Sequence, residues 1–245
     1  MTDSSAFQLL DIKPLQANVS LRMLACDAIK QAITKMNIYD HFEEIRLDER
    51  QLSRDLGVSR TPIREALSLL EHEGFLRSVP RGGIFIVRKN KREILEMIAI
   101  WSAIESMAAR LACEKASDGE LSQLREIASF KKDPIEHVNE YAQSSMAFHR
   151  AIIAMSQCNL MGELTENLFI HMRAIRSMAM NHDDRARRSL AEHLGIVEAL
   201  EARNADLAAR RVNEHTMDLA AYIEKHGNFL DQYENKANVR KAGSK

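Results

Sequence analysis

The sequence predicts a mainly α-helical chain of two parts: a small N-terminal helix-turn-helix unit that ends in a β-hairpin, and a C-terminal all-α helical bundle. Three observations predict this fold. Apolar residues recur at helical spacing almost without a break from residue 91 to residue 226. Strand-like segments are confined to residues 75–87. The chain has only nine glycines and four prolines in 245 residues, which favours helices over sheet.

The most specific pattern lies between residues 48 and 70. Leu52 and Leu56 stand one helical turn apart, and Gly57 supplies the left-handed backbone that a tight exit from a helix needs. Ser59 is in the N-cap position of a second helix, and Pro62 is tolerated in the first turn of that helix. The apolar positions of the second helix are Ile63, Ala66, Leu67 and Leu70. This pattern predicts a helix-turn-helix.

The opposite side of the second helix carries the polar and basic side chains that could bind a ligand. Arg60, Thr61 and Arg64 cluster at its N-terminal end, where backbone N–H groups and the helix dipole favour phosphate and where side chains reach base edges. After Gly74, residues 75–79 and 84–87 are predicted strands around the turn 80–83, with Arg81 at its tip. A hairpin in this place is a wing, so residues 18–88 are predicted to form a winged helix-turn-helix.

Charge supports a polyanionic partner for this unit. Residues 46–92 contain eleven basic and six acidic side chains, whereas the whole chain has a net charge of −1. The alternative is an amphipathic helix whose arginines form an ordinary solvated face. No apolar run is long enough to span a membrane and no secretory leader is recognisable, so we expect a cytoplasmic protein. The three cysteines, Cys26, Cys113 and Cys158, lack disulfide or zinc-ribbon spacing.

A charged joint at residues 89–92 is predicted to lead into a helical domain of residues 93–230. Its expected helices run over about 91–116, 117–130, 133–156, 160–180, 183–202 and 204–226. The second of these begins with a capping-box pattern, Ser117-Asp118-Gly119-Glu120. Residues 1–17 and 231–245 are expected to be mobile tails.

Four histidines lie on apolar helix stripes and are therefore expected to point inward: His149, His171, His193 and His215. Buried imidazoles need partners for both ring nitrogens, and several that converge between helices could share Zn(II), Ni(II) or Fe(II). Taken singly, each is more often a core histidine bonded to a carbonyl or hydroxyl.

The segment Leu52–Leu67 resembles the winged helix-turn-helix of the GntR superfamily almost without a break. The resemblance implies that phosphates and bases are contacted by Arg50, Ser59, Arg60, Thr61 and Arg64. It also implies that Arg81 and Gly82 of the wing approach the minor groove. One departure is the segment 41–44, His-Phe-Glu-Glu, where the family usually has a short Pro-Gly turn.

The second part resembles the FCD effector-binding domain of the FadR branch, through Ile104-Glu105, Phe148-His149-Arg150, Glu192-His193 with Ile196 and Ala199-Leu200, and Ala208-Ala209 before His215. In metal-containing members, histidines at the positions of His149, His193 and His215 join an aspartate, and that position is Ser145 here. A family arginine that pairs with acidic effectors is replaced by Trp101. The resemblance implies one divalent metal, with a poorer ligand at Ser145.

The expected effector pocket is lined by Trp101, Ser145, Arg150, His171 and Arg173. Its cation could come from Arg110, Arg150, Arg173 or Arg176, since periodicity does not decide among them. His171 could neighbour the metal, but we favour an ordinary core residue.

These observations predict a sequence-specific DNA-binding transcriptional regulator, more often a repressor in this family. By resemblance, a small organic acid in the helical domain modulates its affinity for operator DNA. Reading one short site demands dimerisation, so we expect a homodimer on an inverted repeat. A metal-responsive or effector-independent regulator is the alternative. A metal-dependent hydrolase is disfavoured because no Glu or Asp in a local motif is placed as a general base. We therefore expect no enzymatic activity.

Overall fold

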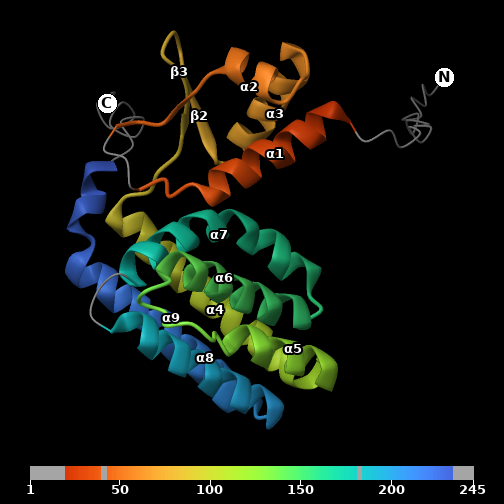
Figure 1. The fold of residues 1–245 in the computed structure, drawn as a ribbon, viewed down its shortest axis with the longest axis vertical. Coiled ribbons are helices and arrows are strands. Elements are labelled where there is room, and N and C mark those ends of the chain that lie inside the picture. Colours follow the sequence, from red (N-terminus) through yellow and green to blue (C-terminus); the bar gives the residue numbers. More distant parts are fainter. Residues whose placement is uncertain (1–19, 40–42, 181–183, 234–245) are drawn as a thin grey trace, which may run out of the picture.

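The computed structural model describes residues 20–39, 43–180 and 184–233. The N-terminal tail expected at residues 1–17 lies outside these ranges, as do residues 41 and 42 of the departure from the family pattern and residues 234–245 of the expected C-terminal tail. The N-terminal unit stands above a helical bundle (Figure 1). Within the described ranges, no helix combines the length and apolarity needed to cross a membrane.

The N-terminal unit contains the predicted helix-turn-helix. It is built from α1 (Leu21–Lys35), α2 (Glu49–Asp55) and α3 (Arg60–His72). Helix α1 packs across α3, and fully buried Ile63 and Leu70 of α3 meet Ile29 and Ile33 of α1 in the core. Gly57 has φ of 65°, the left-handed conformation expected at the turn between α2 and α3.

The wing is an antiparallel sheet of β1 (Arg46–Leu47), β2 (Leu76–Val79) and β3 (Gly83–Ile86), in the order β1-β3-β2. The hairpin of β2 and β3 was predicted, and the register joins Leu76 to Ile86 and Val79 to Gly83. The first strand was not predicted, because two residues are too few to show alternation. It ties the segment before α2 to the wing.

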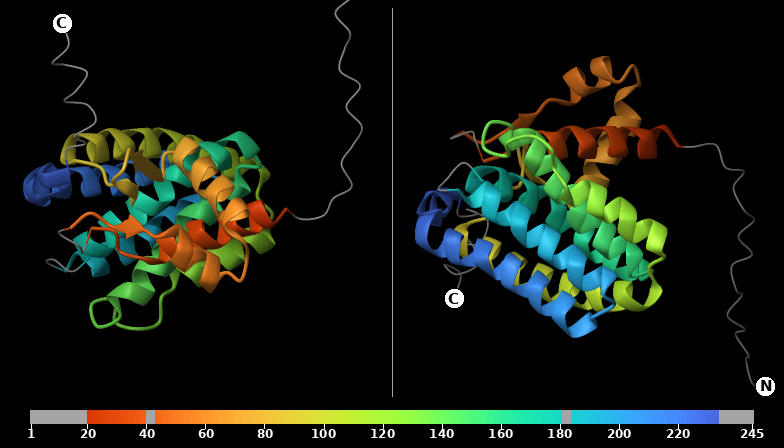
Figure 2. Two further views of the ribbon diagram at one scale, coloured as in Figure 1. Left: turned by 90° about the horizontal axis from the view of Figure 1, so that it is seen from above. Right: turned by 60° about the horizontal axis from the view of Figure 1, so that its bottom comes forward.

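The predicted bundle is present and is formed by α4 (Lys91–Lys115), α5 (Asp118–Ala128), α6 (Val138–Met155), α7 (Asn159–Met180), α8 (Arg185–Glu201) and α9 (Ala205–His226). Helix α4 lies along α9 and also contacts α6 and α7. Figure 2 shows α8 and α9 side by side on the face turned toward the viewer in its right-hand view. Trp101 of α4 is fully buried between these layers.

Local capping signals set the helix starts, and that of α6 differs clearly from the prediction. The capping box at Ser117 and Glu120 is confirmed. A second capping box, Asn90 with Glu93, was missed, and it starts α4 inside the expected joint of residues 89–92. Helix α6 begins at Val138 rather than near Asp133, because the Asp133 side chain accepts a hydrogen bond from the backbone N–H of Ile135 (2.8 Å) and holds a turn.

The expected C-terminal tail begins too early at residue 231. A 3-10 helix, η1, spans Gly227–Tyr233, and Leu230 and Tyr233 are buried. The Tyr233 hydroxyl donates to the backbone carbonyl of Tyr39 (3.3 Å), and the Arg88 guanidinium lies 4.2 Å from the centre of the Tyr233 ring. These contacts fasten the end of the bundle to the N-terminal unit, so residues 231–233 belong to the folded protein.

Helix α7 forms a second joint between the two parts and lies directly below α1 in Figure 1. The Asn167 side-chain amide donates to the backbone carbonyl of Glu73, the C-cap of α3 (2.8 Å). Further along α7, the Arg173 guanidinium donates to the carbonyl of Thr34. The two parts therefore meet through specific polar contacts on one helix.

Candidate functional site

The exposed face of α3 carries the residues predicted to meet DNA. Arg60, Thr61 and Arg64 are exposed in the first turns of the helix, on the side opposite its buried stripe. Ser59 occupies the N-cap position, but its side chain makes no capping hydrogen bond. The start of α3 therefore presents two hydroxyl and two guanidinium groups to solvent.

Helix α2 and strand β1 add to this face. Asp48 caps α2 by accepting from the backbone N–H of Gln51 (2.8 Å), and exposed Arg50 follows in the first turn. The Arg64 Nε donates to Glu49 (2.8 Å), an exposed ion pair of small energetic value. A groove of about 380 Å³ between α2, α3 and the wing is lined by Arg46, Arg50, Arg60 and Arg64 among others.

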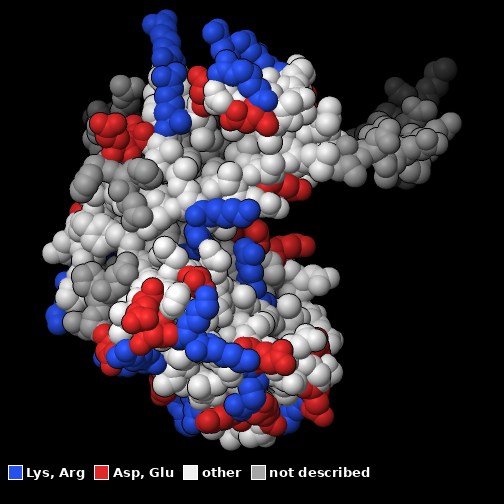
Figure 3. All heavy atoms as spheres, viewed as in Figure 1, with Lys and Arg blue, Asp and Glu red and all other residues white. Residues whose placement is uncertain are grey.

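The tight geometry of the wing turn explains why glycine occupies positions 82 and 83. Arg81 adopts the left-handed conformation at the tip, with φ of 62°. A Cβ atom on Gly82 would lie 2.8 Å from a methyl carbon of Val79, and one on Gly83 would lie 2.6 Å from Nε of Arg46. Figure 3 shows Lys and Arg side chains gathered at the top of the molecule, over the wing and the α2–α3 region. This basic end suits a polyanion.

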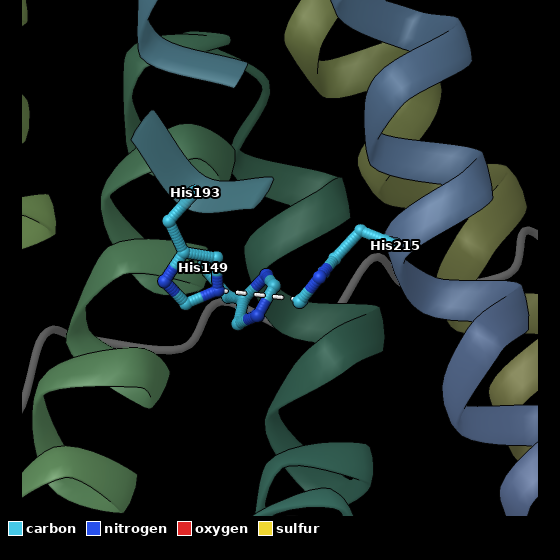
Figure 4. A group of neighbouring side chains, drawn as sticks. All are labelled: His149, His193 and His215. Carbon is cyan, nitrogen blue, oxygen red and sulfur yellow. Dashed lines mark hydrogen bonds between the residues drawn. The ribbon is translucent and has the colours of Figure 1, made fainter. Parts of the chain in front are cut away.

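Three of the predicted histidines meet inside the bundle. His149 of α6, His193 of α8 and His215 of α9 are buried, and each offers a ring nitrogen within 4.8 Å of the others. Figure 4 shows the three rings converging from their separate helices. The Nε2 atoms of His193 and His215 are 3.3 Å apart.

Two carboxylates orient this cluster. The fully buried Glu105 of α4 is hydrogen bonded to Nδ1 of His149, and its other oxygen accepts from Nε1 of Trp101 (2.6 Å). Glu192 of α8 is 2.6 Å from Nδ1 of His215. Carboxylates that hold Nδ1 in this way fix the ring and leave Nε2 as the ligand atom, the arrangement found around metal-bound histidines.

A buried arginine completes the cluster. Arg176 of α7 is 1% exposed, and its Nη1 lies 3.0 Å from Nε2 of His215. Three buried polar atoms of these residues have no hydrogen-bond partner within the described ranges: Nε2 of His149, and Nε and Nη2 of Arg176. Oγ of Ser145, one helical turn before His149, also has none. Unpaired buried polar groups are costly, so their concentration in one place indicates a ligand site.

Electrostatics keep the imidazoles neutral. Burial lowers the pKa of His149 and His193 well below the usual range, and lowers the pKa of His215 to about 4. Burial also raises the pKa of Glu105 to about 7 and lowers the pKa of Arg176 to about 10. At neutral pH the guanidinium is therefore charged and the three rings have lone pairs for a metal.

A surface groove of about 490 Å³ between α8 and α9 borders one member of the cluster, His215. His215 and Glu192 form part of its lining, together with Arg211 and Asp218. The inner side of His215 meets Arg176 and His193, whereas its outer side faces this groove. A small molecule in the groove would therefore be next to the histidine cluster.

Comparison with known proteins decides the family. Residues 27–86 match the bacterial regulatory proteins of the gntR family, and residues 96–218 match the FCD domain. The chain belongs to the GntR family of transcriptional regulators and carries a C-terminal FCD domain. It is a DNA-binding regulator with a winged helix-turn-helix.

Relatives of this GntR regulator are themselves named as regulators. The chain is 30% identical over 183 residues to the Nta operon transcriptional regulator of Aminobacter aminovorans, covering 74% of this chain and 82% of the relative. It is 25% identical over 181 residues to the HTH-type transcriptional repressor RspR of Escherichia coli (strain K12), covering 73% and 79%. Its fold matches that of E. coli McbR/YncC with a TM-score of 0.70 at 22% identity, over 86% of this chain and 100% of that one.

Not all residues predicted for the effector pocket of the FCD domain come together. Trp101 and Ser145 lie at the histidine cluster, whereas Arg150 is half exposed against Glu166 and the ring of Phe169. Arg173 bonds the N-terminal unit and takes no part in the cluster. The cation at the cluster is Arg176, one of four arginines that periodicity could not separate.

His171 is buried as expected but lies at the joint between the two parts of the GntR regulator. Its Nδ1 is 2.9 Å from the Tyr39 hydroxyl, which also accepts from the backbone N–H of Lys89 (3.1 Å). Burial lowers the pKa of His171 to about 3. The preference for a core residue over a metal neighbour fits this placement.

Sequence reasoning missed Glu192 and Arg46 as site residues. Glu192 directly precedes His193 on α8, and adjacent residues of a helix point in different directions. Only the position of His215 on α9 therefore reveals the role of Glu192. Arg46 joins the basic groove because β1 pairs with β3, and that strand was not predicted. Glu105 and Glu192 are both among the residues that carry the resemblance to the FCD domain, but neither had an assigned role.

Acid should destabilise this protein in part through His171. In the unfolded chain the imidazole takes up a proton below its ordinary pKa of about 6.5, whereas the folded state resists protonation down to about 3. Stability from this group is thus full above pH 6.5 and is lost as the pH falls from there toward 3. For His171→Gln, which keeps a partner for Tyr39, the free energy of unfolding should fall less steeply, by up to about 1.4 kcal/mol per pH unit.

Urea unfolding of chelator-treated wild type and His171→Gln at about pH 7, 6 and 5 measures both slopes. Equal slopes would show that His171 is not held neutral at this joint.

Proposed function

We propose that this regulator binds its operator as a homodimer and that a small organic acid bound at the histidine cluster weakens operator binding, so that repression is relieved. The observation that carries this proposal is the convergence of three neutral imidazoles and a buried guanidinium on unpartnered polar atoms. In a helical bundle that binds no ligand, these buried polar groups would only destabilise the fold. The relative named a repressor supports the sign of the effect.

The proposed DNA contacts follow the basic groove. Arg50, Ser59, Arg60, Thr61 and Arg64 would meet bases and phosphates in the major groove, since all five are exposed around the start of α3. From the wing, Arg81 and Gly82 would approach the minor groove. Arg46 would add a phosphate contact between the start of α3 and the tip of the wing. The double-stranded operator is proposed to be an inverted repeat, one half-site for each protomer.

An exposed apolar stripe on α4 supports the homodimer. Ile100 and Met107 stand two helical turns apart and are 53% and 48% exposed. Met217 on the adjacent α9 is also exposed. Apolar side chains on the outer face of a bundle suit contact with a second copy of the chain.

The histidine cluster fits a divalent metal. One ring nitrogen from each histidine lies within 4.8 Å of the others, and the Nε2 of His149 has no partner within the described ranges. Glu105 and Glu192 hold the Nδ1 atoms of His149 and His215. Neutral nitrogen ligands suit Zn(II), Ni(II) or Fe(II). Ser145 stands one turn before His149 and gives no charged ligand, so positions remain open. A bound metal would supply a Lewis acid that accepts a carboxylate oxygen.

Helix α7 offers the route by which such a ligand would alter DNA binding. Arg176 faces the cluster, while Asn167 and Arg173 of the same helix contact the N-terminal unit. A ligand that binds one placement of α7 better than another shifts the population of DNA-binding arrangements, by no more than that difference in affinity.

A metal-responsive regulator without an organic effector is the second candidate, because the three histidines could hold a metal without an organic ligand. Operator titrations with chelated and with metal-loaded protein, in buffer free of organic acids, distinguish the two. If metal alone changes operator affinity, the second candidate is favoured.

For DNA binding, we predict that Arg60→Ala or Arg64→Ala weakens operator binding by about 1–3 kcal/mol each and reduces the preference for operator over scrambled duplex. Arg210→Ala, an exposed arginine of α9, is the control and should have no effect. Fluorescence anisotropy with both duplexes measures the affinities. Unaltered affinity in both α3 variants would contradict the assigned recognition helix.

For the metal, we predict that His193→Ala abolishes stoichiometric binding and that Glu192→Gln lowers metal affinity about 10–100-fold, because Glu192 orients His215. His171→Gln removes a buried histidine outside the cluster and should leave metal affinity unchanged. Elemental analysis and titration with Zn(II) or Ni(II) measure both. Equal metal content in wild type and His193→Ala would exclude this site.

For assembly, we predict that Ile100→Glu and Met107→Glu lower the molar mass measured by light scattering from dimer to monomer, since a charge in an apolar interface is unfavourable. Leu164→Glu, on the exposed face of α7, is the matched control. If only the control variant becomes monomeric, the interface lies on α7 instead.

A further inference from the structure

The guanidinium of Arg176 is the most unusual group in the bundle. It is buried among α4, α6, α8 and α9 side chains, and its only hydrogen bond to a described residue joins Nη1 to Nε2 of His215. A buried charge normally needs an opposite charge and several hydrogen bonds. Among acidic side chains, Glu105 has the largest effect on the pKa of Arg176, but it is bonded to Trp101 and His149 instead.

The two unpaired nitrogens of Arg176 have a geometry that selects for a particular ligand. Nε and Nη2 lie on the same edge of the planar guanidinium, and both lack a partner. Two parallel N–H groups on one edge match the two oxygens of a carboxylate, which binds there as a fork. A point cation would not offer this geometry.

The remaining nitrogen of Arg176, Nη1, is bonded to Nε2 of His215, which a bound metal would also need as a ligand. With Glu192 on Nδ1, His215 has its lone pair on Nε2, and that lone pair accepts from Nη1 of Arg176. A metal on the three histidines requires the same lone pair. A guanidinium so placed also opposes a divalent cation through charge repulsion, which is strong in a buried site.

We propose that Arg176 anchors the carboxylate of the effector and thereby makes anion and metal binding cooperative: a carboxylate on its free edge releases His215 and neutralises the charge that faces the metal. This inference rests on the proposed function and specifies its ligand as a small carboxylate held by α7. By linkage, the anion raises metal affinity by the same factor by which the metal raises anion affinity.

The experiment measures Zn(II) affinity of the full-length protein by competition with a chromophoric chelator, in sodium acetate and in acetamide with sodium chloride at equal ionic strength. Acetamide has the same size as acetate and no charge. In the wild type, acetate should tighten Zn(II) binding about tenfold relative to acetamide, within the usual range of coupling. Fluorescence of Trp101, the only tryptophan, reports pocket occupancy because its indole bonds Glu105.

Arg176→Gln should abolish this coupling and bind Zn(II) in acetamide at least as tightly as the wild type, because the competitor for His215 is gone. Arg176→Lys keeps the charge without the fork and should retain only a small part of the coupling. Arg173→Gln, one turn earlier on α7 and outside the cluster, should behave as the wild type. If Arg176→Gln does not fold, Arg176→Lys against Arg173→Gln decides the question.

Coupling of equal size in wild type and Arg176→Gln would overturn the proposal, since acetate would then act on the metal alone. Absence of coupling in the wild type would also overturn it. The first result leaves the proposed regulation by a metal-bound acid intact, whereas the second leaves only regulation by an acid that binds without contacting the metal. Failure of the wild type to bind Zn(II) at all would instead remove the metal site from the proposed function and this inference with it.

Discussion

The bundle of this protein is organised by the burial of charge. Glu105 and Arg176 lie where water cannot solvate them, and each is connected to a different imidazole of the same cluster. Such groups are retained only where the surrounding helices supply partners or a ligand does. Helices α4, α6, α7, α8 and α9 each contribute a polar side chain to this one region, so their relative placement is tied to it.

Much of the fold was predictable from the sequence because it depends on local signals. The helix-turn-helix follows from Gly57 and the apolar stripe of α3, and the bundle follows from helical periodicity. What could not be predicted depends on pairing at a distance or on a competing local bond. Strand β1 exists only because β3 lies beside it, and α6 starts late because Asp133 bonds its own neighbouring backbone.

The candidate site was predictable in part, and the limit has a physical origin. Helical spacing tells which side of a helix is buried, so the three histidines were expected to point inward. It does not tell which buried side chains meet. Arg150, Arg173 and Arg176 all lie on helices that border the cluster, yet only Arg176 reaches it. Arg150 faces Glu166 and Phe169 of α7, and Arg173 faces the N-terminal unit. To choose among these arginines, one must know how α6 and α7 are oriented about their axes in the packed bundle.

The contact between Asn167 and the carbonyl of Glu73 has a mechanical consequence. Glu73 closes the far end of α3, and the 13 residues of that helix make a rod of about 20 Å with Arg60 at its other tip. A tilt of about 10° transmitted at this pivot would move Arg60 by about 3.5 Å, more than a hydrogen bond tolerates. A displacement at α7 too small to unpack the bundle would thus suffice to take the arginine out of register with the base pair that it is proposed to contact.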